Sequence, residues 1–164
     1  MITVETQGAD DHPYQKENVL ITEKHFWAWQ RKLSPDTLPR MVDEVDELWQ
    51  SGFHSTNGIN DRVPEEIVVK FNAPSLCLIR PDDFTLLVSD DLDGRKKVRA
   101  RFSYHDTPYL LAVTDPGIEK KYLLKEQGEY PLSAGDLYLT VSMSEPFNGF
   151  CYKLVAALIL QDEG

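Results

Sequence analysis

The feature that most constrains the fold is a change of sequence period at residue 75. From there to residue 160, short runs alternate apolar and polar residues, which is the pattern of β-strands with one buried face. The run that begins at Leu137 is the clearest, since every second residue to Met143 is apolar and Thr140 and Ser142 lie between them. Six such runs predict strands at 75–80, 84–89, 96–104, 109–113, 136–143 and 150–160.

One short helix interrupts these strands. Asp115 can cap it, Pro116 suits its first position, and Gly128 follows its end near Lys125. Strands, then a helix, then two more strands is the order of the OB-fold, a five-stranded Greek-key barrel. The first two runs then form one long strand bent at Pro81, or a hairpin added to the barrel. A different small barrel or sandwich would give the same order of elements.

The first 74 residues show a different pattern of apolar and polar residues. Residues 2–6 alternate and predict a short strand, and two helices are predicted at 23–33 and 36–49. The second helix starts at a cap, Asp36, and stops at Gly52. Its predicted apolar stripe consists of Leu38, Met41, Val42, Val45, Leu48 and Trp49.

These patterns predict an α+β, mainly β chain: an OB-like five-stranded barrel at 75–160 with an N-terminal helical segment packed on it. An N-terminal strand and turn occupy 1–21, and the helical linker segment with a polar loop occupies 22–74. The run at 150–160 is apolar on both faces, which is unusual for an antiparallel barrel strand. We therefore expect the N-terminal helices, or a partner chain, to cover it.

Composition narrows the class of protein. The chain has 164 residues, 41% of them hydrophobic, so it can bury a core as one domain or one domain with an appendage. No apolar run approaches the ~20 residues of a membrane span, and no secretory signal is visible, so we expect a cytoplasmic protein with no membrane partner. Cys77 and Cys151 lie in apolar runs and are expected to be buried free thiols.

The net charge of −10 argues against indiscriminate nucleic-acid binding, because a phosphate backbone repels an acidic surface. One segment of the sequence departs from this acidic character, since five of the seven residues at 95–101 are basic. Strand alternation turns Lys97, Arg99 and Arg101 outward, on the strand that comes second in an OB-fold and belongs to its ligand face. We predict that these three bind single-stranded DNA or RNA, with Tyr109 as a stacking residue and Lys153 as a further cation.

A second interpretation of the same segment needs no ligand. Lysine and arginine on an edge strand prevent pairing with other chains. The cations can also pair within the molecule, with Asp90, Asp91 and Asp93 just before them.

Signs of catalysis are weak. The chain has no glycine-rich phosphate loop and no nucleophile elbow, and its aspartate clusters lie in turn-like contexts. We therefore expect a non-enzymatic protein without catalytic residues, metal or cofactor. The polar loop at 53–64 carries a motif of unassigned role, whose side chains could simply bond the neighbouring backbone. Its residues are His54, Asn57, Asn60, Asp61 and Arg62.

Several segments, in order along the chain, together form a recognisable pattern. They are Gln15, Glu17 and Asn18; Leu48, Trp49 and Gly52; the loop from His54 to Val63; 98–104 with Tyr109; Val113 to Pro116; and 142–157 with Glu145, Pro146, Phe147 and Gly149. This pattern resembles the dual OB-fold-containing domain proteins of prokaryotes. The resemblance implies two OB domains joined by a helical linker, and a nucleic-acid-binding or sensing role in prokaryotic conflict (defence) systems without a catalytic mechanism.

The resemblance covers the helical linker and the second OB domain, while the motifs that open the family's first OB domain are absent from this sequence. We therefore expect a shortened member, or one half of a split pair whose protein partner supplies or replaces the first OB domain. The alternative function is an acidic adaptor, or a subunit that binds a protein partner in a larger complex.

Overall fold

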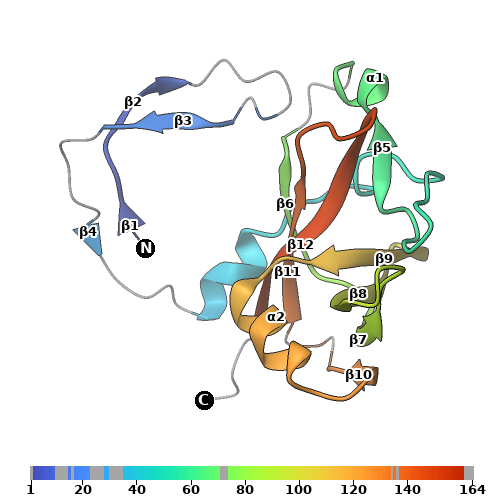
Figure 1. Ribbon diagram of the computed structural model, residues 1–164. Coiled ribbons are helices and arrows are strands. Elements are labelled where there is room, and N and C mark those ends of the chain that lie inside the picture. Colours follow the sequence, from blue (N-terminus) through green and yellow to red (C-terminus); the bar gives the residue numbers. More distant parts are fainter. Residues whose placement is uncertain are drawn as a thin grey trace.

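The computed structural model describes residues 2–9, 15, 17–22, 28–29, 35–70, 74–133, 135 and 137–160. Its main body is an eight-stranded sheet (Figure 1). The strands are β5 (Arg62–Pro64), β6 (Leu76–Ile79), β7 (Asp83–Asp90), β8 (Lys96–Tyr104), β9 (Thr107–Val113), β10 (Gly128–Pro131), β11 (Leu137–Met143) and β12 (Phe150–Leu160). The hydrogen-bonded order is β10-β7-β8-β9-β12-β11-β6, with β5 paired to β12.

This order contains the strand order of an OB-fold. β9 and β12 pair in parallel, Leu154 opposite Ala112, because helix α2 (Pro116–Leu123) carries the chain across between β9 and β11. β6 and β7 are two halves of the predicted first strand, separated by residues 80–82 around Pro81. α2 begins as predicted, since the Asp115 carboxylate accepts hydrogen bonds from the backbone N–H groups of Gly117 (2.9 Å) and Ile118 (3.1 Å).

The predicted OB-like β fold is confirmed, but the strands do not form a closed barrel. No pairing between described strands joins the two ends of the sheet, so β6 and β7 are linked only through the chain at residues 80–82. The outer edge of β7 is taken instead by β10, a strand that the sequence pattern did not predict. The sheet is therefore open, and its strands follow the order of an OB-fold.

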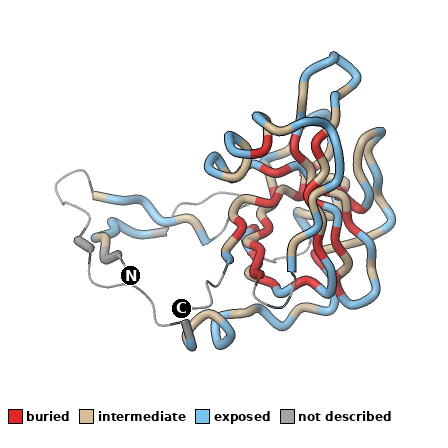
Figure 2. The backbone as a smooth tube through the Cα atoms, turned by 90° about the horizontal axis from the view of Figure 1, so that it is seen from below, coloured by how far each residue is buried: buried red, intermediate tan, exposed pale blue. Residues whose placement is uncertain are grey.

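The core fills the inner face of this sheet (Figure 2). Along β8, Val98, Ala100, Phe102 and Tyr104 are all buried, which confirms the predicted alternation of that strand. The ring of Phe102 stacks on the ring of Tyr109 at 5.3 Å between centroids. Such aromatic pairs add specific packing to the area that they bury.

The prediction of a helix at 36–49 is wrong. A 3₁₀ helix, η1 (Pro35–Arg40), is followed by irregular chain to residue 61. Trp49 has a φ of 60°, which a right-handed helix excludes, and the backbone N–H of Leu48 donates to the Tyr109 hydroxyl (3.2 Å) instead of to its own helix. Tertiary contacts have replaced the helical hydrogen bonds.

The apolar spacing nevertheless marked the residues that reach the core. Leu48 is fully buried among the strands, and Val45 and Trp49 pack against the same cluster. Met41, at the start of the segment, is 50% exposed. We call residues 45–51 the plug segment, because they fill the open side of the core without forming a regular element.

Four short strands lie away from the main sheet (Figure 1). β1 (Ile2–Thr3) pairs with β4 (Ala28–Trp29), and β2 (Thr6–Ala9) pairs with β3 (Val19–Ile21). The predicted strand at 2–6 is thus divided between β1 and β2. Of the helix predicted at 23–33, only Ala28 and Trp29 are described, and they form a strand; the remainder lies outside the described residues.

The cover of β12 also differs from the expectation of N-terminal helices. β5 pairs with its first residues, and helix α1 (Glu65–Val68) follows β5 directly. Ile67 and Val68 pack against the buried cluster of Val63, Met143 and Cys151. Cys77 and Cys151 are both buried free thiols, as predicted. In the described part of the chain, no helix has the length and apolar character needed to cross a membrane.

Leu48→Ala should lower the free energy of unfolding by about 2–5 kcal/mol, because it empties a fully buried site. Met41→Ala, in the same predicted stripe but half exposed, should change it by less than about 0.5 kcal/mol. Urea unfolding of both variants measures the difference. Equal reductions in stability would show that the plug segment does not enter the core as described.

Candidate ligand face on strands β7 to β9

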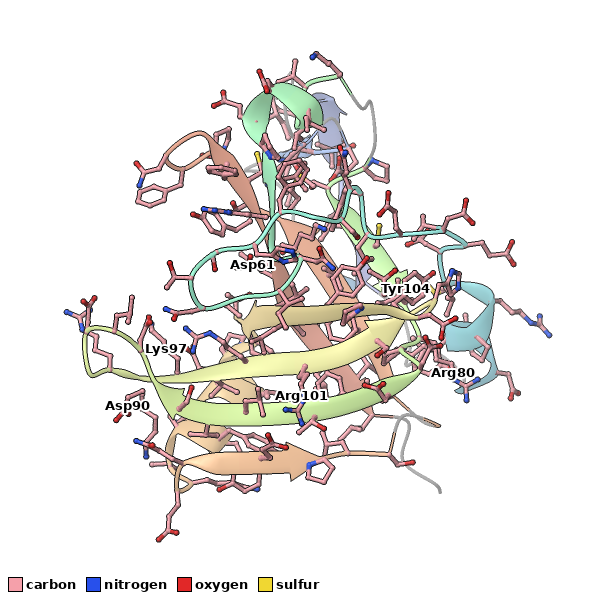
Figure 3. All side chains as sticks on the ribbon, turned by 90° about the vertical axis from the view of Figure 1, so that its right-hand side faces the viewer. Asp61, Arg80, Asp90, Lys97, Arg101 and Tyr104 are labelled. Atoms are coloured by element: carbon pink, nitrogen blue, oxygen red, sulfur yellow. The ribbon has the colours of Figure 1, made fainter. Side chains whose placement is uncertain are left out.

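The predicted basic residues lie on the outward face of the sheet. Lys97, Arg99 and Arg101 alternate along β8 with the buried residues, and Figure 3 shows Lys97 near the β7–β8 turn and Arg101 farther along the strand. On the neighbouring strands, Leu87 and Ala112 lie opposite Arg99 in the register. The cations therefore share one surface built from β7, β8 and β9, with apolar side chains between them.

Two of the three cations have partners within the molecule. Arg101 donates two hydrogen bonds to the Glu129 carboxylate, at 2.9 and 2.7 Å. This bidentate pair raises the pKa of Arg101 and lowers the pKa of Glu129. Arg99 lies 3.5 Å from Asp91, one of the aspartates predicted as a partner.

Lys97 differs from its neighbours on β8. It is exposed, and within the described residues it forms no ion pair. The Arg101–Glu129 pair is itself about half exposed, so solvent screens the attraction between its charges and the pair contributes little to stability. A phosphate group can therefore compete with Glu129 for Arg101. Glu129 lies on β10. The short run of residues after α2 was the sequence signal from which this strand, and with it the position of Glu129, could have been predicted.

The structure places the other two predicted binding residues inside the protein. Tyr109 is 0% exposed and Lys153 is 1% exposed, so neither offers a surface to a ligand. The Tyr109 hydroxyl accepts from the Leu48 N–H and lies 3.2 Å from Ser51 Oγ. Burial raises the pKa of Tyr109.

Lys153 holds the same plug segment. Its Nζ donates to the Gln50 carbonyl oxygen at 2.7 Å and lies 5.3 Å from the centroid of the Tyr109 ring. Burial lowers the pKa of Lys153 to about 8, although the carboxylates of Glu47 and Asp61 act in the opposite direction. Tyr109 and Lys153 thus provide hydrogen-bond partners for backbone groups of the plug segment.

Several side chains of the polar loop motif form hydrogen bonds with other groups of the same loop. The Asp61 carboxylate accepts from the N–H (2.7 Å) and hydroxyl (2.5 Å) of Ser55. The Asn60 side chain accepts from Gly52 and donates to the carbonyl of Pro108, and the Asn60 N–H donates to His54 Nδ1 at 2.8 Å. This agrees with the simplest interpretation of the motif, local bonds between polar side chains and the backbone.

The loop also reaches the ligand face. Asn57 Nδ2 donates to Asp91 Oδ1 at 2.6 Å, the same carboxylate oxygen that lies near Arg99. Ile59 forms an isolated antiparallel bridge with Leu110 of β9. Arg62, the last residue of the motif, begins β5 and places its guanidinium 4.0 Å from the centre of the Phe150 ring. The loop therefore links the β7–β8 turn to the start of β12.

A hollow of about 570 Å³ lies at the other end of β8, near Arg80 and Tyr104 (Figure 3). Asp43, Glu44 and Asp46 line it. Its acidic lining separates it from the basic face in character as well as in position. In the described part of the chain, no group of three or more metal-ligating side chains is arranged to hold an ion.

A family model described as the dual OB-containing domain matches residues 1–158. No curated protein and no solved structure matches the sequence.

Gly58→Ala should destabilise the loop motif, because a Cβ at Gly58 would lie 2.1 Å from Asp61 Oδ2. Asp61 would have to move and break its bonds to Ser55, so we expect the free energy of unfolding in urea to fall by about 1–3 kcal/mol. Gly135→Ala, where the nearest atom is 3.7 Å away, is the control and should be close to neutral. A neutral Gly58→Ala would contradict the described contact.

Lys153 should make stability depend on pH in the alkaline range. Its pKa falls from 10.5 in the unfolded chain to about 8 in the folded protein, so between these values the unfolded state binds more protons. The free energy of unfolding of the wild type, relative to Lys153→Met, should therefore rise from about pH 8 to pH 10.5 by up to about 3 kcal/mol. Parallel curves for the two proteins would refute this, since the tyrosines and cysteines titrate in both.

Proposed function

This chain belongs to the dual OB-containing domain family, and from that premise we propose that it binds single-stranded DNA or RNA through the outward face of β8. The observation that carries the proposal is the position of Lys97, Arg99 and Arg101. They project from the strand that stands second in the OB order, on a face where OB-folds receive oligonucleotides.

The proposed binding is weak and depends strongly on salt. The protein as a whole carries −10, and Arg99 and Arg101 already have carboxylate partners. A ligand phosphate must therefore displace Glu129 or Asp91, or bind first at Lys97. Because the local field, and not the total charge, governs docking at short range, a strip of cations can still attract a phosphate backbone.

We also propose that the module acts without catalysis, in the cytoplasm, as a nucleic-acid sensor in a prokaryotic conflict system. The sensing role in a conflict system rests on the resemblance of the sequence to the family.

A protein partner is the second candidate ligand. β3 supports it, since Val19, Leu20 and Ile21 are each 44–50% exposed on a two-stranded sheet away from the main body. A two-stranded sheet is marginally stable by itself in water, and a partner strand or domain would stabilise it. In this form of the proposal the partner supplies or replaces a first OB domain.

The double variant Lys97→Glu/Arg101→Glu should weaken the binding of a thymine oligonucleotide by about tenfold at low salt. The slope of log K against log [salt] should also become shallower by about 0.7 for each phosphate that the variant no longer neutralises. Fluorescence anisotropy over a salt series measures both quantities. Lys120→Glu/Lys121→Glu, an equal change of charge on the exposed side of α2, is the matched control and should reduce binding much less.

Two results would decide against this site. Equal effects of the two double variants would show that only total charge matters. A wild-type protein that does not bind the oligonucleotide even at low salt would exclude nucleic-acid binding and leave the protein partner as the remaining candidate.

A further inference from the structure

A second outward surface lies beside the loop motif, on the two-stranded ribbon of β5 and β12. Tyr152 pairs with Arg62, and Phe150 pairs with Pro64. Val63 and Cys151, which alternate with them, are fully buried. Strand alternation therefore places Arg62, Phe150 and Tyr152 together on the outward face, and all three are partly exposed.

Phe147 joins this face across a tight turn. Phe147 and Phe150 form an isolated antiparallel bridge with two backbone hydrogen bonds, of 2.8 and 3.2 Å, and Asn148 and Gly149 between them both have positive φ. Directly opposed residues of such a pair project on the same side. Phe147 is 65% exposed, so its side chain meets solvent on the same side of the turn as Phe150.

Arg62 has an unused hydrogen-bonding group here. Its guanidinium carbon lies 4.0 Å from the centre of the Phe150 ring, and its buried Nε has no hydrogen-bond partner in the described part of the chain. Arg62 also forms no ion pair within the described residues. A planar cation stacked on an aromatic ring and lacking a carboxylate partner is suited to receive a flat, polar group.

We propose that Phe147, Phe150 and Arg62 form a base-stacking platform for the single-stranded nucleic acid whose phosphates contact β8. This inference rests on the proposed function and adds to it the part of the site that binds bases. The predicted stacking residue, Tyr109, is buried and cannot take this role. OB modules combine a basic groove with aromatic platforms, and each stacked base contributes without regard to its sequence.

The path between the two parts of the site is short. Arg101 lies opposite Leu110 in the β8–β9 register, and Leu110 is bridged to Ile59, which is 37% exposed. Arg62 follows Ile59 by three residues, which can span at most about 10 Å. A strand a few nucleotides long can therefore contact the cations of β8 and the platform at once.

The platform should add affinity that is insensitive to salt. Phosphate contacts with the cations of β8 release counterions, so their contribution to binding falls as the salt concentration rises. Stacking, by contrast, releases no counterions. The cations and the rings can thus be distinguished by the salt dependence of their contributions.

The test compares Phe147→Ala with wild-type protein on two probes: a thymine oligonucleotide of about 12 nucleotides, within the ~4–16 of an OB-fold, and an abasic strand of the same length. The variant should bind the thymine strand about fivefold more weakly or worse, with an unchanged salt slope, and should bind the abasic strand as the wild type does. Arg62→Lys, which keeps the charge and removes the planar group, should show a similar but smaller selective effect. Leu124→Ala, at an apolar residue that is 85% exposed at the C-terminal end of α2, is the control and should alter neither.

The outcomes separate this inference from the function on which it rests. If the wild type binds the thymine strand and Phe147→Ala binds it equally well, the platform is refuted and the β8 site stands. An equal weakening on both probes also refutes stacking, because it would reflect a changed fold or backbone contact. If the wild type binds neither strand at low salt, the proposed function itself fails, and the aromatic face would then be tested as a contact for a protein partner.

Discussion

The interaction on which the rest of the structure depends is the support that Tyr109 and Lys153 give to the plug segment. Residues 45–51 enter the core as irregular chain, so their backbone groups cannot satisfy one another. The Tyr109 hydroxyl accepts from the Leu48 N–H, and Lys153 Nζ donates to the Gln50 carbonyl oxygen. An unpaired backbone group at this depth would cost ~1–3 kcal/mol, so each side chain removes a penalty as well as adding a bond. Burying the ammonium is itself unfavourable, and the lowered pKa of Lys153 expresses that cost.

The loop motif depends on the same support. The Lys153 N–H donates to the Asp61 carbonyl oxygen, so β12 fixes the loop at Asp61, while the side chain of Asn60 bonds to the carbonyl of Pro108 at the start of β9. β9 and β12 pair only at two registered positions, and the chain from Ile59 to Pro64 occupies the space where they diverge. The polar motif is therefore part of the sheet's construction. Its position there brings Arg62 to the outward face beside Phe150.

The strands of the second half could be predicted from sequence because one buried face imposes a period of two. β8 and β12 have the predicted limits, and α2 was marked by its cap. The plug segment could not be predicted, since its apolar spacing suits a helix and only a distant hydroxyl, on Tyr109, makes the irregular path stable. The face of the sheet on which Tyr109 and Lys153 lie could not be predicted either. β9 and β12 are apolar on both faces, so alternation alone does not say which face is inward. Phe147 could not be recognised as a surface residue because nothing local distinguishes an exposed ring from a buried one.

The charge distribution gives the two parts of the proposed site different tasks. An acidic exterior repels polyanions at a distance, and the carboxylates of Asp91 and Glu129 reduce the field of β8 even at close range. Phosphate contacts alone would then give weak binding to single and double strands alike. Stacking on rings requires unpaired bases, so it would favour single strands and add affinity that the acidic surface does not diminish. Specificity for single strands would thus come from the aromatic face, and the internal ion pairs of β8 would suppress binding wherever no base is free to stack.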